Sequence, residues 1–342
     1  MLRIFAYEYT CAHMAPAEVP ASLQIEGWTM LSAVLEDFCR LPDLLVSTLL
    51  HNNHPQRAVN PRCAAIFTDD EEEAFRKLAR NADFALVIAP EFDDILLTRC
   101  RWVKDEGCRL LGPSPAAVQL TGDKYACARH LSNHGVPTPE CRLLVGDHHG
   151  DGIKFPAVFK PRHGAGSEST FVINCENEFE KAIRGRNTGA VARHCILQPY
   201  VQGQPVSVAF ILGPSQHIPL LPSSQIQSGC GRLRYLGGAL PLSPLLADRA
   251  VRLAEKAVIS VPGLLGYVGV DLVLGDAPDG TKDWVIEINP RLTTSYIGLR
   301  ALSQTNLSET MLRAVRGADI ASPVWRPGSV RFYADGKVEV FS

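Results

Sequence analysis

The chain has 342 residues, which at about 150 residues per domain predicts two domains, or one domain of fused lobes. Lys and Arg number 34 and Asp and Glu 36, so the net charge of −2 argues against nucleic-acid binding through phosphate neutralisation. With 46% hydrophobic residues the chain can bury a large core, and no apolar run reaches the about 20 residues that span a bilayer.

Residues 1–112 alternate strand-like and helix-like segments. Apolar runs of strand length alternate with segments whose apolar residues recur at helical spacing. Strands that alternate with helices predict a parallel α/β sheet covered on both faces. The expected strands are residues 2–7, 43–50 and 84–89, and the expected helices are residues 26–38, 71–81 and 94–106.

A second region begins at Gly112-Pro113, and its pattern is different. Short strands now outnumber helices, and one stretch is rich in glycine. The expected helices are residues 124–133, 176–186, 245–258 and 307–315; the expected strands are residues 157–159, 170–173, 195–198, 206–212 and 218–221; a glycine-rich loop is expected over 228–238, and hairpins are expected over 269–288 and 330–341.

Ten cysteines are spread along the chain without a Cys-x-x-Cys pair. The N-terminal segment reaches Glu8 too early for a signal peptide. In a long chain without an export signal, cysteines are typically reduced core residues. We therefore expect a cytoplasmic globular protein without a nucleic-acid or membrane partner, for which a homodimer is possible.

The hairpin over 269–288 and the residues after it carry the most informative polar side chains. Glu287 and Asn289 lie two residues apart and share one face of a strand, and Asp271 lies on the facing strand. Two carboxylates and an amide oxygen on an apolar hairpin are suited to Mg²⁺. Alternatively, Arg291 pairs with Glu287 and no metal binds. The hairpin by itself leaves the two interpretations even.

A strand, a lysine and a small-residue loop follow one another over residues 155–168. Glycines let the backbone approach an anion, and consecutive N–H groups can cradle a phosphate. The loop lacks the Gly-Lys-Ser/Thr of a Walker loop and the third glycine of a dinucleotide fingerprint. It is typical of a flap over a ligand, although a plain hairpin loop with a solvated Lys160 is the simpler interpretation of the loop alone.

Two other segments carry weaker signals. Lys124 follows Asp123 at a helix start, where an ammonium and the helix N-terminus together can hold an anion; a solvated surface lysine is commoner. Residues 196–203 join an apolar strand to a turn whose backbone can contact a purine edge, but a domain connector has the same pattern.

Competing chemistries have little support. The chain has neither a Gly-x-Ser-x-Gly elbow nor a His-Glu-x-x-His pair. The pair His130 and His134 and the pair His51 and His54 lack nearby third and fourth ligands, so zinc is not expected.

Taken in order, these motifs resemble those of the ATP-grasp ligases, and the resemblance covers essentially the whole chain. The motifs are Asp123-Lys124, Phe159-Lys160 with its glycine loop, Leu197-Gln198-Pro199-Tyr200-Val201, Asp271 and Glu287-Ile288-Asn289-Pro290-Arg291. The resemblance implies a parallel α/β lobe followed by two α+β lobes of an ATP-grasp fold. The implied division is a pre-ATP-grasp domain over 1–112, a central lobe with the flap over 113–197, a C-terminal lobe with the metal site over 198–320 and a hairpin tail over 321–342.

The same resemblance implies ATP and Mg²⁺ as cofactors, with Mn²⁺ a possible substitute. The implied nucleotide-binding residues are Lys124, Lys160, Gly164, Gly166, Ser167, Gln198, Tyr200 and Val201, and the implied metal ligands are Asp271, Glu287 and Asn289. In the resemblance, residues 198–201 form the hinge between the two ATP-grasp lobes, whose backbone meets the adenine. One departure concerns the ribose, which many family members contact through an acidic residue just after the hinge. Here Gln204 and Pro205 stand at that place, so Gln204 or another lobe would provide the contact.

Four segments are similar to those of the tyramine–L-glutamate ligases, which serve methanofuran-type cofactor synthesis. They are Phe5-Ala6-Tyr7-Glu8-Tyr9, Glu26-Gly27-Trp28-Thr29-Met30-Leu31, Ala89-Pro90-Glu91 and residues 287–296. Glu26-Gly27 and Thr293-Thr294-Ser295-Tyr296 are the discriminating pieces. The similarity implies small-molecule substrates, a carboxylic acid and an amine, in this case L-glutamate and tyramine.

The expected reaction forms an acyl phosphate from ATP and a carboxylate, and the amine then displaces phosphate. Such chemistry needs positioning and charge neutralisation rather than an enzyme nucleophile. We expect Lys160 and Arg291 to be catalytic, because the fork of Arg291 suits both an acyl phosphate and an oxyanion. Candidate substrate residues are Arg232 and Arg234, which are otherwise surface arginines, and Thr293, Thr294 and Ser295. The alternatives are a ligase for another amino acid or peptide, and an inactive nucleotide-binding regulator.

Overall fold

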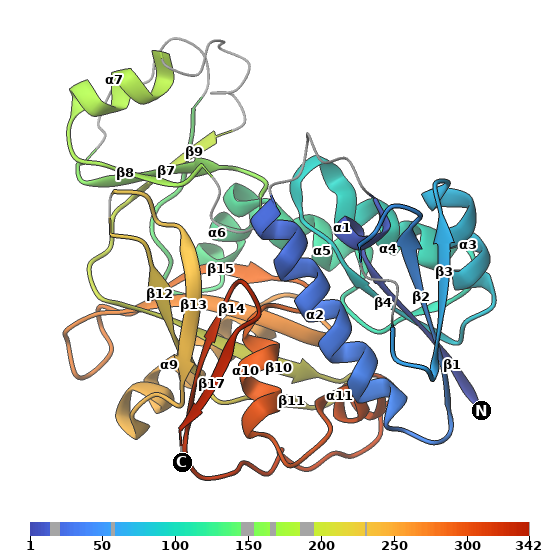
Figure 1. The fold of residues 1–342 in the computed structure, drawn as a ribbon. Coiled ribbons are helices and arrows are strands. Elements are labelled where there is room, and N and C mark those ends of the chain that lie inside the picture. Colours follow the sequence, from blue (N-terminus) through green and yellow to red (C-terminus); the bar gives the residue numbers. More distant parts are fainter. Residues whose placement is uncertain are drawn as a thin grey trace.

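The computed structural model describes residues 1–13, 21–55, 59–144, 154–164, 169–184, 195–229 and 231–341. This part of the chain forms a five-stranded sheet, a four-stranded sheet and an eight-stranded sheet (Figure 1). None of the helices described is long and apolar enough to cross a membrane.

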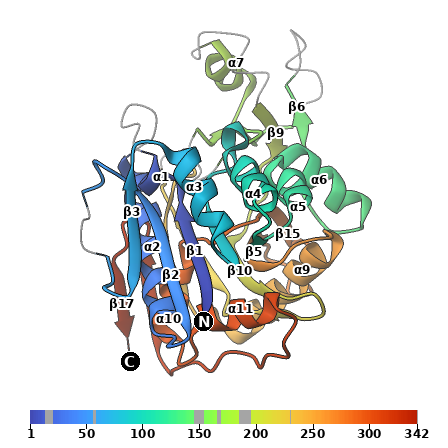
Figure 2. The same cartoon turned by 90° about the vertical axis from the view of Figure 1, so that its right-hand side faces the viewer.

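The N-terminal sheet is parallel throughout and has the order β3-β2-β1-β4-β5. Side chains of β1 alternate between its faces: Ile4 packs with α2, whereas Phe5 and Tyr7 pack with α3 and α4. Figure 2 shows α3 and α4 in front of this sheet and α2 behind it. The predicted α/β lobe is confirmed. Its elements are β1 (Leu2–Glu8), α1 (Tyr9–Ala12), α2 (Ala21–Cys39), β2 (Leu44–His51), β3 (Cys63–Thr68), α3 (Glu71–Arg80), β4 (Phe84–Ile88), the 3₁₀ turn η1 (Phe92–Asp94), α4 (Ile95–Asp105) and β5 (Arg109–Leu110).

The four-stranded sheet is antiparallel, has the order β6-β9-β7-β8 and lies at the top of Figure 1. Phe179 of α7 packs on it together with Phe159. Backbone contacts tie this sheet to the loop after β12, because the N–H of Val172 donates to the carbonyl of Gly231. Its elements are β6 (Arg142–Leu143), β7 (Ala157–Pro161), β8 (Phe171–Ile173), α7 (Glu176–Arg184) and β9 (Cys195–Pro199).

The large sheet is antiparallel, in the order β15-β14-β10-β12-β13-β16-β17 with β11 beside β10. On β10, Val208 faces the helices α5, α6 and α9, whereas Ala209 and Ile211 face α10 and α11. Its elements are α5 (Pro115–Gly122), α6 (Lys124–Asn133), β10 (Gln204–Leu212), β11 (His217–Pro219), β12 (Ser223–Gln227), β13 (Tyr235–Leu240), α9 (Pro244–Ser260), β14 (Gly266–Leu274), β15 (Trp284–Asn289), α10 (Ser295–Leu302), α11 (Leu307–Val315), β16 (Ser329–Tyr333) and β17 (Val338–Phe341).

Helix α2 joins the N-terminal lobe to the large sheet. One continuous core cluster contains Ile4 of the first sheet, Leu31 of α2 and Met311 of α11. The helix therefore lies between the two sheets, as its diagonal course in Figure 1 shows. This placement brings the first turns of α2 to the segment just before α10, where Thr294 contacts Glu26.

Several elements were not predicted. The glycine-rich stretch expected as a loop over 228–238 contains the start of β13, because Gly238 lets that strand pack closely on its neighbours: a Cβ there would lie 2.5 Å from Ser224 O and 2.7 Å from the ring of Phe332. Glycine in a strand is commonly taken for a turn. Helix α10 was missed because buried residues surround it and erase the amphipathic pattern. The unpredicted elements also include α1, β3, η1, α5, β6 and β12.

Candidate active site

A cavity lies between the small sheet and the large sheet, at the place where helix α2 begins. Its walls come from β7, β9, β10, β12, β14, β15 and the segment before α10. Most residues predicted for the site line it, namely Lys124, Lys160, Gly164, Gln198, Tyr200, Val201, Asp271, Glu287, Asn289, Arg291, Thr293, Thr294 and Ser295. Gly166 and Ser167 lie outside the described residues.

The candidate metal site is built on the β14–β15 hairpin. Asp271 and Glu287 are directly opposite each other in its register. The carboxylate of Asp271 accepts from Gln225 Nε2 at 2.8 Å and from Asn289 Nδ2 at 3.0 Å. Burial, followed by the nearby charge of Glu287, raises the pKa of Asp271 to about 6.

These oxygens fit a hard divalent cation. Two carboxylates in register repel each other, and a cation between them would remove that repulsion. Because Asn289 donates its Nδ2 to Asp271, its Oδ1 is left as a ligand atom. The site therefore offers two carboxylates and one amide oxygen, a set that suits Mg²⁺.

Two lysines approach Glu287 from the other side of the cavity. Lys124 Nζ lies 3.4 Å from Glu287 Oε2 and donates to the carbonyl of Gly164 at 2.7 Å. Lys160 is buried, and loss of hydration lowers its pKa while the charge of Glu287 opposes that effect. Burial would raise the pKa of Glu287, but the charges of Lys124 and Lys160 lower it overall. The cavity therefore concentrates positive charge beside the facing carboxylates.

The position of Lys124 is fixed by the start of α6. Asp123 caps this helix by accepting from the N–H groups of Tyr125 and Ala126. The guanidinium of Arg162 donates to both oxygens of Asp123, at 2.8 and 2.5 Å. In addition, Lys124 N–H donates to Arg162 O at 3.0 Å. The predicted Asp-Lys motif thus ties the helix to the strand that carries Lys160.

Arg291 lines the cavity. Among the described residues it pairs with Glu91 and not with Glu287, the pairing that was the alternative to a metal site on the hairpin. Its Nε donates to Glu91 Oε1 at 2.9 Å, and Nη2 lies 3.4 Å from Glu91 Oε2. The carboxylate of Glu91 is buried, and its charge contributes to raising the pKa of Arg291 against the effect of burial. The guanidinium is therefore held by the N-terminal lobe.

An apolar slot forms the end of the cavity near the predicted hinge. Val158, Leu272 and Ile286 line it together with Tyr200 and Val201. The N–H of Tyr200 already donates to Pro156 O at 2.9 Å, so the slot would rely on other hinge groups to contact a ring edge. Gln204, which was predicted as one possible contact to the ribose, is exposed and is not among the described residues that line the cavity. Gln227 does line the cavity.

The structure keeps two predicted substrate residues out of the cavity. Arg232 and Arg234 are exposed and are absent from its described lining. The guanidinium of Arg232 lies 5.6 Å from the ring centre of Phe171, where it supports the loop against the small sheet. Their neighbours Leu233 and Tyr235 line the cavity instead, because side chains alternate direction along this extended segment.

The comparison with protein families agrees with this geometry. Residues 121–295 match the ATP-grasp domain, and residues 45–118 match the pre ATP-grasp 3 domain. The chain belongs to the ATP-grasp family. The resemblance inferred from the motifs is thereby confirmed, as is the expectation of an ATP-dependent ligase of this family.

Individual ATP-grasp proteins resemble the chain over most of its length. It is 25% identical to the tyramine–L-glutamate ligase of Methanocaldococcus jannaschii over 301 residues, which cover 86% of this chain and 84% of that protein. A putative ATP-grasp superfamily protein from Archaeoglobus fulgidus superposes with a TM-score of 0.71 at 23% identity, covering 97% and 92% of the two chains. Carboxyaminoimidazole ribonucleotide synthase from Aspergillus clavatus, complexed with ATP, gives 0.72 at 18% identity, covering 96% and 81%. These structures show the fold.

Some polar residues in or directly behind the wall of this ATP-grasp cavity were given no role by sequence reasoning. Gln225 holds Asp271, Glu91 holds Arg291, and Glu26 lines the wall beside Thr294. For Glu26 and Glu91, the signal was the similarity of their segments to the tyramine–L-glutamate ligases. No pattern around Gln225 distinguishes it from an ordinary strand residue.

Proposed function

We propose that the chain is an ADP-forming ligase that joins L-glutamate to tyramine through an amide bond. The observation that carries the ligase chemistry is the meeting of two ammonium groups with two facing carboxylates in one cavity. The substrate pair is supported by the 25% identical relative and by the segments around Glu26 and Thr294. A cytoplasmic location and a homodimer stay predictions.

In this proposal ATP lies along the cavity from the hinge to the β14–β15 hairpin. The apolar slot between Val158 and Leu272 receives the adenine, and Gln227 is placed to meet the ribose. Lys124 and Lys160 contact the phosphates, whose negative charge offsets the cost of keeping two ammonium groups close together.

Asp271, Glu287 and Asn289 would hold Mg²⁺ in the same proposal. The ion would neutralise phosphate charge during phosphoryl transfer. Gln225 and Asn289 orient the carboxylate of Asp271 by donating one hydrogen bond to each of its oxygens. The hairpin thus presents its oxygen atoms in a fixed direction.

The γ-phosphoryl group of ATP would pass to the substrate carboxylate and produce an acyl phosphate. Arg291 stands next to this centre and can stabilise the oxyanion that develops when the amine attacks. Its pairing with Glu91 fixes the guanidinium before substrate binds, which reduces the reorganisation required in the transition state.

A coupled assay for ADP tests the proposal. The protein is incubated with ATP and Mg²⁺, and with L-glutamate and tyramine separately and together. We expect ADP and amide only when both substrates are present, and no ADP with D-alanine in place of them. Turnover with another acid and amine would retain the ligase and overturn the substrate pair. ATP binding without ADP release from any pool of acids and amines would instead indicate a nucleotide-binding regulator.

A further inference from the structure

Glu26 is a cavity carboxylate to which the reaction described so far gives no role. It lies in the second turn of α2 and lines the cavity. Its Oε1 accepts from the hydroxyl of Thr294, the residue just before α10. Among the described residues, the hydroxyl of Thr294 is the hydrogen-bond partner of the Glu26 carboxylate.

The two lysines and the arginine of the cavity have oppositely charged partners. Lys124 and Lys160 face Glu287, and Arg291 is paired with Glu91. The cavity is lined by three cations and by the carboxylates of Glu26, Asp271 and Glu287, while Glu91 behind Arg291 adds a fourth carboxylate. Asp271 and Glu287 are the proposed ligands of a cation, whereas Glu26 has the neutral hydroxyl of Thr294 as its partner and is not part of the proposed metal site.

A carboxylate withdrawn from water costs free energy unless a cation compensates it. Burial raises the pKa of Glu26, and the hydroxyl of Thr294 and the distant charge of Arg291 offset only part of that effect. Arg291 cannot provide full compensation because its guanidinium already binds Glu91. The environment of Glu26 thus favours the arrival of a cation from the cavity.

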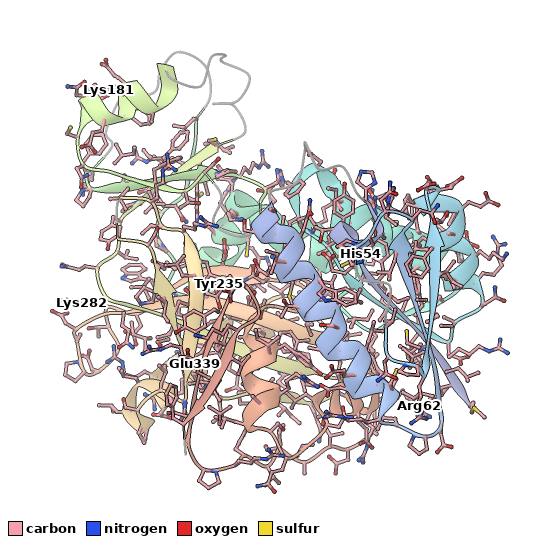
Figure 3. The ribbon with its side chains drawn as sticks, viewed as in Figure 1. His54, Arg62, Lys181, Tyr235, Lys282 and Glu339 are labelled. Atoms are coloured by element: carbon pink, nitrogen blue, oxygen red, sulfur yellow. The ribbon has the colours of Figure 1, made fainter. Side chains whose placement is uncertain are left out.

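The location of Glu26 relates it to the bond-forming centre. Its partner Thr294 lies three residues after Arg291, and both residues line the cavity together with Glu26. Figure 3 labels Tyr235, which is the first residue of β13 and another residue of the cavity wall. Glu26 is therefore held next to the segment that carries Arg291, the residue proposed to act on the acyl group.

We infer that Glu26 binds the ammonium group of the amine substrate and holds its nitrogen toward the acyl phosphate. The inference rests on the proposed ligase function and adds the group that recognises the amine. The proton of the ammonium passes to the carboxylate of Glu26; the nitrogen lone pair then forms the C–N bond, the bond from the acyl carbon to the phosphate oxygen breaks, and inorganic phosphate leaves. The nitrogen's second proton passes to solvent as the tetrahedral intermediate collapses.

The two half-reactions can be separated with hydroxylamine, which is a neutral nucleophile near pH 7.5 and traps acyl phosphates as hydroxamates. The proteins compared are the wild type, Glu26→Gln, Glu26→Asp and the control Glu36→Gln, which changes an exposed carboxylate of the same helix. Each is incubated with ATP, Mg²⁺ and L-glutamate, and with either hydroxylamine or tyramine.

For Glu26→Gln we expect hydroxamate formation close to that of the wild type and a fall of about 10- to 100-fold in kcat/KM for tyramine, as for the loss of a charge-assisted hydrogen bond. The KM for tyramine should rise because the ammonium loses its counter-charge, and kcat with tyramine should fall because the ammonium proton loses its acceptor. Glu26→Asp should recover part of the loss, and Glu36→Gln should match the wild type.

A binding measurement gives a readout apart from turnover. Wild-type protein should bind tyramine more tightly than its neutral alcohol analogue 2-(4-hydroxyphenyl)ethanol, and Glu26→Gln should lose that preference. Equal amide formation by Glu26→Gln and wild type, or an equal loss of hydroxamate and amide in a folded Glu26→Gln protein, would overturn the inference. A wild-type protein that forms neither hydroxamate nor amide would overturn the proposed function itself, and the inference with it.

Discussion

The guanidinium of Arg291 is bonded to Glu91, 200 residues earlier in the chain, with Nε and Oε1 2.9 Å apart. This contact ties the segment after the candidate metal strand to the loop after β4. Glu91 is buried and little of the Arg291 side chain is exposed, so the ion pair is largely shielded from solvent. The contact holds the guanidinium of Arg291 in the cavity, where we expect it to act on the acyl group.

Replacing Glu91 with Gln should release Arg291 from this position. We expect the free energy of unfolding to fall by about 1–3 kcal/mol, because a buried charged group loses its partner. The value of kcat should fall more than the KM for ATP changes, since the hinge is untouched. Urea unfolding and steady-state kinetics measure the two effects. Glu36→Gln is the control and should change stability by less than about 1 kcal/mol, because its ion pair is exposed.

Lys160→Ala should weaken ATP binding by about 10- to 100-fold, since a charge-assisted contact to phosphate is lost. Titration calorimetry with ATP measures this change directly. The control is Lys154→Ala, which removes an exposed lysine near the same sheet and should bind ATP as the wild type does. Unchanged ATP affinity in Lys160→Ala would remove Lys160 from the phosphate site.

Glu287→Gln should mainly impair metal-dependent phosphoryl transfer. We expect a much higher Mg²⁺ concentration for half-maximal ADP release, because one of two charged ligands becomes neutral. Chelation of divalent ions by EDTA should abolish turnover of the wild type. Full activity of Glu287→Gln across a Mg²⁺ titration would contradict the metal assignment.

Mg²⁺ binding should weaken as the pH falls through about 6. The pKa of Asp271 is raised to about 6 by burial and by Glu287, and only the ionised carboxylate is a good ligand, so protons compete with the metal below that pH. About a tenth of the group would be ionised at pH 5, which predicts roughly tenfold weaker apparent affinity than at pH 8. Metal titrations at several pH values measure this trend, which Asp271→Asn should flatten.

Gly27→Ala should destabilise the fold at the junction of α2 and the first strand. A Cβ at this position would lie 2.5 Å from both Glu8 Cδ and Thr10 Oγ1, which are hydrogen-bonded partners beneath the helix. We expect a loss of about 1–3 kcal/mol from overpacking, measured by thermal or urea unfolding. Gly112→Ala is the matched control, because a Cβ there meets nothing within 4 Å. Equal stability of the two variants would contradict the packing described.

The sequence by itself determined the parts of the site that depend on local geometry. Asp271, Glu287 and Asn289 could be placed together because a hairpin and the two-residue period of a strand bring them to one face. Likewise, the alternation of strands and helices was enough to predict the parallel N-terminal sheet.

Only the tertiary structure decided which groups meet across the lobes. The partner of Arg291 is Glu91 rather than the nearby Glu287, and Thr294 meets Glu26, 268 residues away. Arg232 and Arg234 are kept outside the cavity by the course of one extended segment. Such contacts depend on how α2 packs between two sheets, which is set by the summed burial of many apolar side chains rather than by any motif near the charged residues.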